Sequence, residues 1–166
     1  MSAAIEAQAG ARVGAWIAVA GILLDQASKH WVLDIARLSD SGPWPLSSFA
    51  DLRLVWNRGI SYGLFQQGSE AGRWMLVGVA IVAAIGLELW LVRIRSLLVG
   101  LAVGLILAGA VGNAIDRAIY GAVIDFVYLH SPDGTLTWYV FNLADAWIVV
   151  GVAALLYDSI LSNRSG

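Results

Sequence analysis

Four long apolar stretches alternate with polar segments along the chain, over residues 13–33, 74–92, 97–115 and 143–161. Each is close to the roughly 20 residues that an α-helix needs to cross a bilayer. The pattern therefore predicts a mainly α membrane protein with four transmembrane helices. An even number of spans places both long connections on one side of the membrane and both termini on the other. We expect the whole chain, residues 1–166, to form one domain.

The two long connections carry signals of a small β-structure. Residues 34–73 form a large loop, in which Pro43 and Pro45 mark irregular backbone and residues 51–57 look strand-like. Residues 121–142 predict a β-hairpin, because two segments rich in β-branched and aromatic residues, 123–129 and 135–141, flank a Ser-Pro-Asp-Gly turn.

The first apolar stretch has a second interpretation. Arg12 precedes an apolar run, as in a cleaved secretory signal. Three further spans and the polar cluster after Leu24 favour a retained membrane helix. The third span carries a small-residue ridge, Gly100, Gly104, Ala108 and Gly112, on which a neighbouring helix can approach closely.

Composition agrees with lipid as the solvent of these stretches. Of the 166 residues, 59% are hydrophobic and 13% are charged, whereas an ordinary soluble domain carries about 25% charged residues. The net charge of −2 argues against nucleic acid as a partner. The chain has no cysteine, which excludes disulfides, a thiol nucleophile and cysteine-bound metal. His30 and His130 stand singly, so we expect no metal site.

Arginine counts do not decide the orientation in the membrane. Four arginines flank the side of the termini and four lie in the large loop, so the positive-inside rule gives a tie. The short basic link 93–96 favours a cytoplasmic location for the side of the termini.

Polar residues gather where spans meet the long loops, although a charge at the bilayer centre costs roughly 2.5–3.5 kcal/mol. They close the first and third spans, lie in the hairpin and open the fourth span: Asp25, Gln26, Ser28, Lys29, Asn113, Asp116, Arg117, Asp125, Asn142 and Asp145. Their common depth predicts a polar chamber at one membrane face. Glu88 and Asp158 lie toward the opposite face and are expected to be interfacial charges.

Several of these residues have a structural explanation. Asp25 and Lys29 are four residues apart on one helical face, in the order that favours an ion pair, and Lys29 could extend toward the interface. Arg117 could hold Asp116 or Asp25 as part of the scaffold.

Asp125 and Asp145 differ from the other acids, because neither has a basic partner at helical spacing. A turn between a strand and a helix could bring them together. Two adjacent carboxylates in low dielectric share one proton, as in aspartic peptidases. Carboxylate pairs in membranes also serve as proton relays, so spacing alone leaves both interpretations open.

The order of the motifs resembles the bacterial lipoprotein signal peptidases, also called signal peptidase II. Five blocks carry the resemblance: 24–29, 55–63, 109–117, 121–126 and 141–145. The resemblance implies an aspartic endopeptidase that removes the signal peptide of a prolipoprotein before a diacylglyceryl-modified cysteine. It further implies four helices with an extracytoplasmic β-cradle and a mobile flap.

The family pattern also implies residue roles. Asp125 and Asp145 match the catalytic pair. The residues that line or support the site would be Asp25, Lys29, Asn57, Gly109, Asn113, Asp116, Arg117 and Asn142. No metal or organic cofactor is required. The implied partners are the modified prolipoprotein, membrane lipid and globomycin-type inhibitors. The implied location is the bacterial inner membrane, with both termini cytoplasmic and the active site at the outer face.

One block departs from the family pattern. Many members have Asn-Thr-Gly-Ala-Ala-Phe where this chain has Asn57-Arg58-Gly59-Ile60-Ser61-Tyr62, so the pattern assigns Arg58 no role. Two rival functions fit the pattern of polar residues less well. A transporter would spread ionisable residues through the bilayer depth or break a helix at its midplane, and a membrane scaffold would not need the polar chamber.

Overall fold

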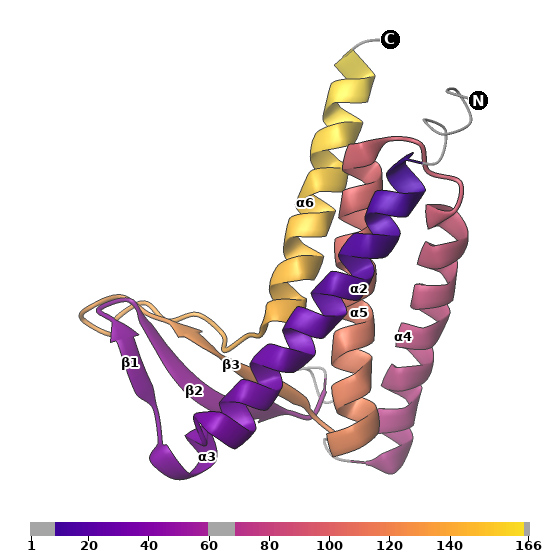
Figure 1. The fold of residues 1–166 in the computed structure, drawn as a ribbon. Helices are drawn as coiled ribbons and strands as arrows, with labels where there is room; N and C mark the ends of the chain where they lie inside the picture. The colour runs from indigo at the N-terminus through magenta and orange to yellow at the C-terminus, as the bar shows by residue number, and fades with distance from the viewer. Residues whose placement is uncertain (1–8, 60–68, 165–166) are drawn as a thin grey trace.

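The computed structural model describes residues 9–59 and 69–164. Within these ranges the long helices are α2 (Ala9–His30), α4 (Glu70–Leu91), α5 (Leu97–Tyr120) and α6 (Leu143–Arg164). α5 packs against α2, α4 and α6 and so forms the centre of the bundle. α2 begins and α6 ends at the same end of the bundle, as Figure 1 shows.

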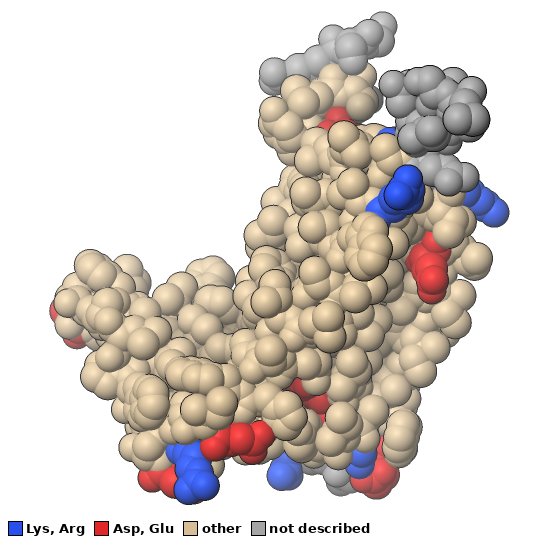
Figure 2. Space-filling model, viewed as in Figure 1, with Lys and Arg blue, Asp and Glu red and all other residues tan. Residues whose placement is uncertain are grey.

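Three of the described helices are long and apolar enough to cross a membrane: Glu70–Leu91, Leu97–Tyr120 and Leu143–Ser162. α2 also has 22 residues, but Arg12, Asp25 and Gln26 lower its apolar content. The count of four spans therefore stays a prediction for this helix. Most charged side chains on the face seen in Figure 2 gather toward the two ends of the molecule, which leaves a long uncharged band between them.

The small-residue ridge of α5 brings α2 into backbone contact. A Cβ added at Gly100 would overlap the carbonyl oxygen of Gly10, and one at Gly104 would overlap that of Gly14. The two backbones touch because neither helix places a side chain between them. The predicted packing role of the ridge is confirmed.

The first predicted span differs from the structure in its ends. We expected a helix over 13–33, but the α-helix begins at Ala9 and ends at His30. A π-helical turn over Trp31–Ile35 and a short helix α3, Leu38–Ser41, follow it. The turn brings Val32 and Ala36 against Leu52 and Phe126 in a buried apolar cluster. This cluster attaches the sheet to the end of the bundle (Figure 1).

The sheet has three antiparallel strands in the order β1-β2-β3. β2 (Ala50–Asn57) and β3 (Val123–Leu129) confirm the strands predicted over 51–57 and 123–129. β1 (Trp44–Ser47) was not predicted, since Pro43 and Pro45 indicated irregular backbone. It is an edge strand, where a proline costs no ladder hydrogen bond.

The predicted hairpin over 121–142 is only partly correct. The segment 135–141 forms no regular strand and makes two isolated bridges: Phe141 pairs with Val127 of β3, and Thr137 pairs with His130, the residue after β3. β3 pairs along its length with β2 instead. Phe141 is only two residues before the start of α6 at Leu143, so the strand pairing cannot continue beyond it. Residues 60–63 of the second motif block lie outside the described residues.

Candidate active site

Asp125 faces the helices because of strand alternation. Its neighbours Ile124 and Phe126 point to the opposite side of β3, into the apolar cluster. Asp125 is only 2% exposed. Its carboxylate accepts hydrogen bonds from Asn57 Nδ2 at 3.0 Å and Asn142 Nδ2 at 2.7 Å. Two amide groups therefore hold this carboxylate in one orientation.

Asp145 lies in the first turn of α6, where a reciprocal cap holds it. The Asp145 amide donates to Asn142 Oδ1 at 3.0 Å, and the Asn142 amide donates to Asp145 Oδ2 at 3.3 Å. This is the geometry of a capping box with Asn as the first residue and Asp as the fourth. Asn113 Nδ2 from α5 donates to Asp145 Oδ1 at 2.8 Å.

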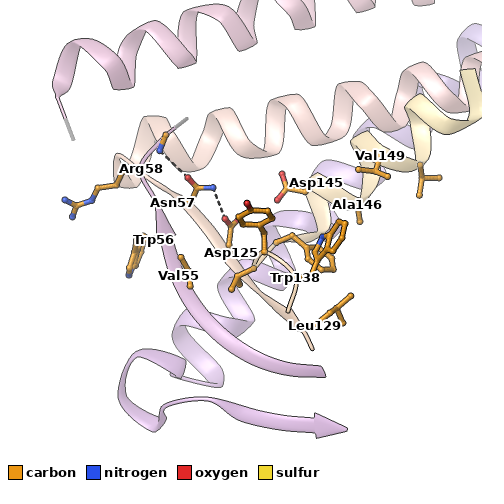
Figure 3. A pocket seen from close by; sticks show the side chains of 15 residues that line it. Val55, Trp56, Asn57, Arg58, Asp125, Leu129, Trp138, Asp145, Ala146 and Val149 are labelled. Atoms are coloured by element: carbon orange, nitrogen blue, oxygen red, sulfur yellow. Dashed lines mark hydrogen bonds between the residues drawn. The ribbon is translucent and has the colours of Figure 1, made fainter. Parts of the chain in front are cut away.

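Asp125 and Asp145 line the same pocket, which has a volume of about 990 Å³ and is shown in Figure 3. Asn57 lines it as well, and its other walls are largely apolar. These walls come from β2, from the end of β3, from the segment 138–141 and from one side of α6, and they include Val55, Trp56, Leu129, Trp138, Phe141, Ala146, Val149 and Val150. The pocket thus joins two carboxylates to an apolar surface that continues along a membrane-length helix.

Burial sets the protonation of Asp125. Burial, helped by the negative charge of Asp145, raises the pKa of Asp125, while hydrogen bonds from Asn57 and Asn142 partly oppose the shift, and the resulting pKa is about 6. Near pH 6 this carboxyl therefore exists in both forms, which suits a group that gives and takes a proton.

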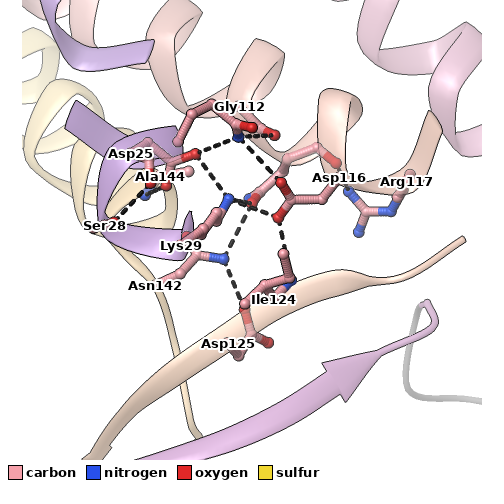
Figure 4. Close-up of polar contacts among 12 residues, drawn as sticks. Asp25, Ser28, Lys29, Gly112, Asp116, Arg117, Ile124, Asp125, Asn142 and Ala144 are labelled. Carbon is pink, nitrogen blue, oxygen red and sulfur yellow. Dashed lines mark hydrogen bonds and ion pairs between the residues drawn. The ribbon is translucent and has the colours of Figure 1, made fainter. Parts of the chain in front are cut away.

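Lys29 forms the centre of a buried polar network beside the pocket (Figure 4). Its Nζ lies 2.8 Å from Asp25 Oδ2, 2.7 Å from Asp116 Oδ2 and 3.2 Å from Asn113 Oδ1. The predicted pairing of Asp25 with Lys29 is confirmed. The expectation that Lys29 extends to the interface is wrong, because its side chain is only 2% exposed. Two carboxylates neutralise it in place.

The two acids that hold Lys29 also hold the backbone next to each candidate catalytic residue. Asp116 Oδ2 accepts from the amide of Ile124, the neighbour of Asp125, at 3.1 Å. Asp25 Oδ1 accepts from the amide of Ala144, the neighbour of Asp145, at 3.0 Å. The network therefore connects β3 and α6 through one buried cation.

Gly109 lies where two helices approach closely, and Arg117 has a different partner from the one expected. A Cβ at Gly109 would overlap the carbonyl oxygen of Ala144, so glycine allows the start of α6 to approach α5. Arg117 was expected to hold Asp116 or Asp25. Lys29 pairs with both acids instead, and Arg117 Nη1 lies 3.4 Å from the carbonyl oxygen of Asn113.

Gln26 belongs to this network, although it is not among the site residues that the family pattern supplied. Its amide Nε2 lies within 3.2 Å of Asp25 Oδ2, Asp116 Oδ1 and the carbonyl oxygen of Gly112. Its position beside Asp25 in an apolar span was a usable signal. The apolar residues of the pocket wall could not be identified from the sequence, because apolar residues occur throughout the spans of a membrane protein.

Fold and site together define a helical membrane protein with two carboxylates in one pocket, the arrangement that aspartic peptidases use. The sequence profile of the signal peptidase (SPase) II family matches residues 17–161, and the chain belongs to this family. It is an aspartic endopeptidase of the bacterial inner membrane that removes signal peptides from prolipoproteins.

Individual relatives support the same family assignment. The lipoprotein signal peptidase of Methylobacterium sp. (strain 4-46) is 54% identical over 93% of this chain and 92% of its own length. That of Methylorubrum extorquens (strain PA1) is 54% identical over 90% of this chain and 86% of its own length. A solved bacterial membrane enzyme superposes with a TM-score of 0.75 at 25% identity, over 92% of this chain and 89% of that chain.

Proposed function

We propose that Asp125 and Asp145 are the catalytic pair that hydrolyses the peptide bond before the diacylglyceryl-modified cysteine of a prolipoprotein. The observation that carries the proposal is the contact of Asn142 with both acids. Its side-chain Nδ2 donates to Asp125, and its backbone amide donates to Asp145. One residue thereby aligns two carboxylates in a single pocket.

The surroundings of the two acids favour different roles. Asp145 lies in the first turn of α6, where two N–H donors hold its carboxylate in one orientation as an acceptor. Asp125 is buried, which favours its protonated form. We assign Asp145 as the general base and Asp125 as the general acid.

Hydrolysis then follows from these protonation states. Asp145 takes a proton from water as the water oxygen attacks the scissile carbonyl carbon, while Asp125 gives its proton to the carbonyl oxygen. In the resulting diol the carbon–nitrogen bond breaks. The leaving nitrogen takes the proton from Asp145, and one hydroxyl returns its proton to Asp125, which restores both acids.

Asn113 and Lys29 support Asp145 in this scheme. Asn113 Oδ1 accepts from Lys29 Nζ at 3.2 Å and from Asn142 Nδ2 at 3.1 Å. With its oxygen held by two donors, the Asn113 amide must turn its NH₂ group toward Asp145. Lys29 thus acts on the base through an oriented amide.

The remaining residues of the proposed site hold Asp125 or the backbone, or contribute charge. Asn57 orients Asp125. Asp25 and Asp116 position the chain beside the two catalytic acids, and Gly109 allows α6 to approach. Arg117 adds a positive charge close enough to act on both Asp125 and Asp145.

The apolar side of the pocket suits the lipid part of the substrate. Val149 and Val150 are exposed on α6, and Trp138 is exposed beside them. Acyl chains of the modified cysteine would contact this surface from the bilayer, while the peptide bond reaches the two acids. Globomycin-type inhibitors would occupy the same pocket.

We further propose that α2 is the fourth span, that both termini are cytoplasmic and that the active site faces outward, with all 166 residues in one domain. The sheet, whose strands carry part of the pocket lining, lies at the opposite end of the bundle from the start of α2 and the end of α6 (Figure 1). The short basic link at Arg93 and Arg95 lies with the latter and favours the cytoplasm there.

The test is cleavage of a diacylglyceryl-modified prolipoprotein by the purified protein in detergent. We expect cleavage of the modified substrate, little cleavage of the unmodified one and none by Asp125→Asn or Asp145→Asn. Asp158→Asn is the matched control, because this acid lies near the far end of α6. Substantial cleavage by either dyad variant would refute the assignment.

A further inference from the structure

A second, smaller pocket lies beside the active-site pocket. Its volume is about 180 Å³, and its lining residues are polar or charged apart from Gly121: Arg58, Ser69, Glu70, Arg73, Tyr120 and Gly121. They come from the end of β2, the start of α4 and the end of α5. This is the end of the bundle that carries the sheet (Figure 1).

Arg58 belongs to both pockets. It follows Asn57, the residue that orients Asp125, but its side chain points away from Asp125 in Figure 3. Trp56 lines the large pocket and Tyr120 lines the small one, and the centroids of their two rings lie 5.7 Å apart. A ligand held at Asp125 therefore needs only to pass Arg58 to reach the second pocket.

The small pocket carries an excess of positive charge. Arg73 is already engaged: it donates to the carbonyl oxygens of Arg117 and Ala118 and pairs with Glu70 at 3.1 Å. Among the described residues, none forms an ion pair or hydrogen bond with the Arg58 guanidinium. Glu70 thus offsets Arg73, and no residue within 9–59 or 69–164 pairs with Arg58 in the same way.

Other groups around the pocket also favour an anion. Tyr120 has a hydroxyl that can donate, and Ser69 caps the start of α4, whose N-terminus carries partial positive charge. Because the walls are polar, an acyl chain gains nothing there, whereas a carboxylate would gain charge-assisted hydrogen bonds.

We propose that Arg58, supported by Arg73, forms a subsite for an acidic side chain in the first residues of the mature lipoprotein. This inference rests on the proposed function. The mature chain leaves the two catalytic acids toward water, and the polar pocket lies beside that path. The subsite would make Arg58 a specificity-determining residue that favours acidic over neutral or basic residues after the cut.

The experiment uses lipid-modified substrates that are identical except at one position among the three residues after the cysteine. That position carries Asp, Ser or Lys, and each of the three positions is varied in turn. We expect kcat/KM to be about two- to five-fold higher for Asp than for Ser, the range of an exposed ion pair, and lower again for Lys. In Arg58→Ala the Asp-to-Ser ratio should fall to about one, and Arg58→Lys should keep part of it. Arg53→Ala is the matched control, because Arg53 is on the same strand but lies over Tyr128 and lines neither pocket.

Each outcome decides the proposal. A ratio near one in the wild type, or a preference that survives Arg58→Ala, overturns it. A rate that depends on Arg58 and on anionic phospholipid, whatever the substrate sequence, overturns it in favour of a lipid phosphate. Failure to cleave any of the substrates would instead count against the catalytic assignment, so the two failures are distinguishable.

Discussion

Asn113 Nδ2 on α5 donates to Asp145 Oδ1 on α6 over 2.8 Å, between residues 32 positions apart. A hydrogen bond to a charged group contributes roughly 1.5–3 kcal/mol. Asn113→Ala should therefore lower kcat by about ten- to hundred-fold, because the base loses an orienting donor. Asn113→Asp keeps the shape but replaces the donor with a third acid, so its loss should be at least as large. Steady-state kinetics check this, and a wild-type kcat in Asn113→Ala would contradict it.

Lys29 should contribute to stability as well as to activity. Lys29→Met leaves Asp25 and Asp116 buried without their shared cation. Breaking a buried pair costs about 3–5 kcal/mol, so the unfolding temperature in detergent should fall sharply. Arg12→Met, on an exposed position of the same helix, should change it little. Adding Asp116→Asn to Lys29→Met should restore part of the loss, and a further drop would argue against shared neutralisation.

Activity should decline as pH rises through the pKa of Asp125, which is about 6. The proposed acid works only when protonated, so its contribution is present below this pKa and is lost tenfold per unit above it. Asn57 favours the charged form of Asp125. Asn57→Ala should therefore raise the pKa and move the decline in kcat/KM to higher pH, together with some loss of maximal rate.

The profile of kcat/KM against pH separates this effect from simple disruption. Arg53→Ala, on the same strand as Asn57, should leave the position of the decline unchanged. A decline that stays in place or moves to lower pH in Asn57→Ala would contradict the assignment of Asp125 as the acid.

The contact between α2 and α5 should tolerate no added side chain. Gly104→Ala would overlap the backbone of Gly14, which cannot move aside as a flexible side chain can. The helices must separate, at a cost of about 1–3 kcal/mol. Gly78→Ala on α4 is the control, because a Cβ there meets nothing within 4 Å. It should be neutral or stabilising, since alanine favours a helix. Thermal unfolding in detergent compares them, and equal effects would contradict the packing argument.

Local signals in the sequence identified much of the molecule. Apolar runs marked the helices, because each needs enough apolar length to cross lipid. Polar residues such as Asp25 and Asn113 stood out because they interrupt those runs at a cost in free energy. The acids Asp125 and Asp145 were found as charges without a helical partner, and the family motifs supplied their roles.

The partner of each polar group follows from the assembled fold. Lys29 pairs with Asp116 as well as with Asp25, and this takes Asp116 away from Arg117. β3 pairs with β2 along its length, while residues 135–141 make only isolated bridges. Such contacts join distant positions and leave no periodic signature. Sequence alone indicates which residues interrupt the apolar pattern that lipid requires. Packing determines their partners, because a buried charge or a strand edge pairs with the group that the assembled fold brings nearest to it.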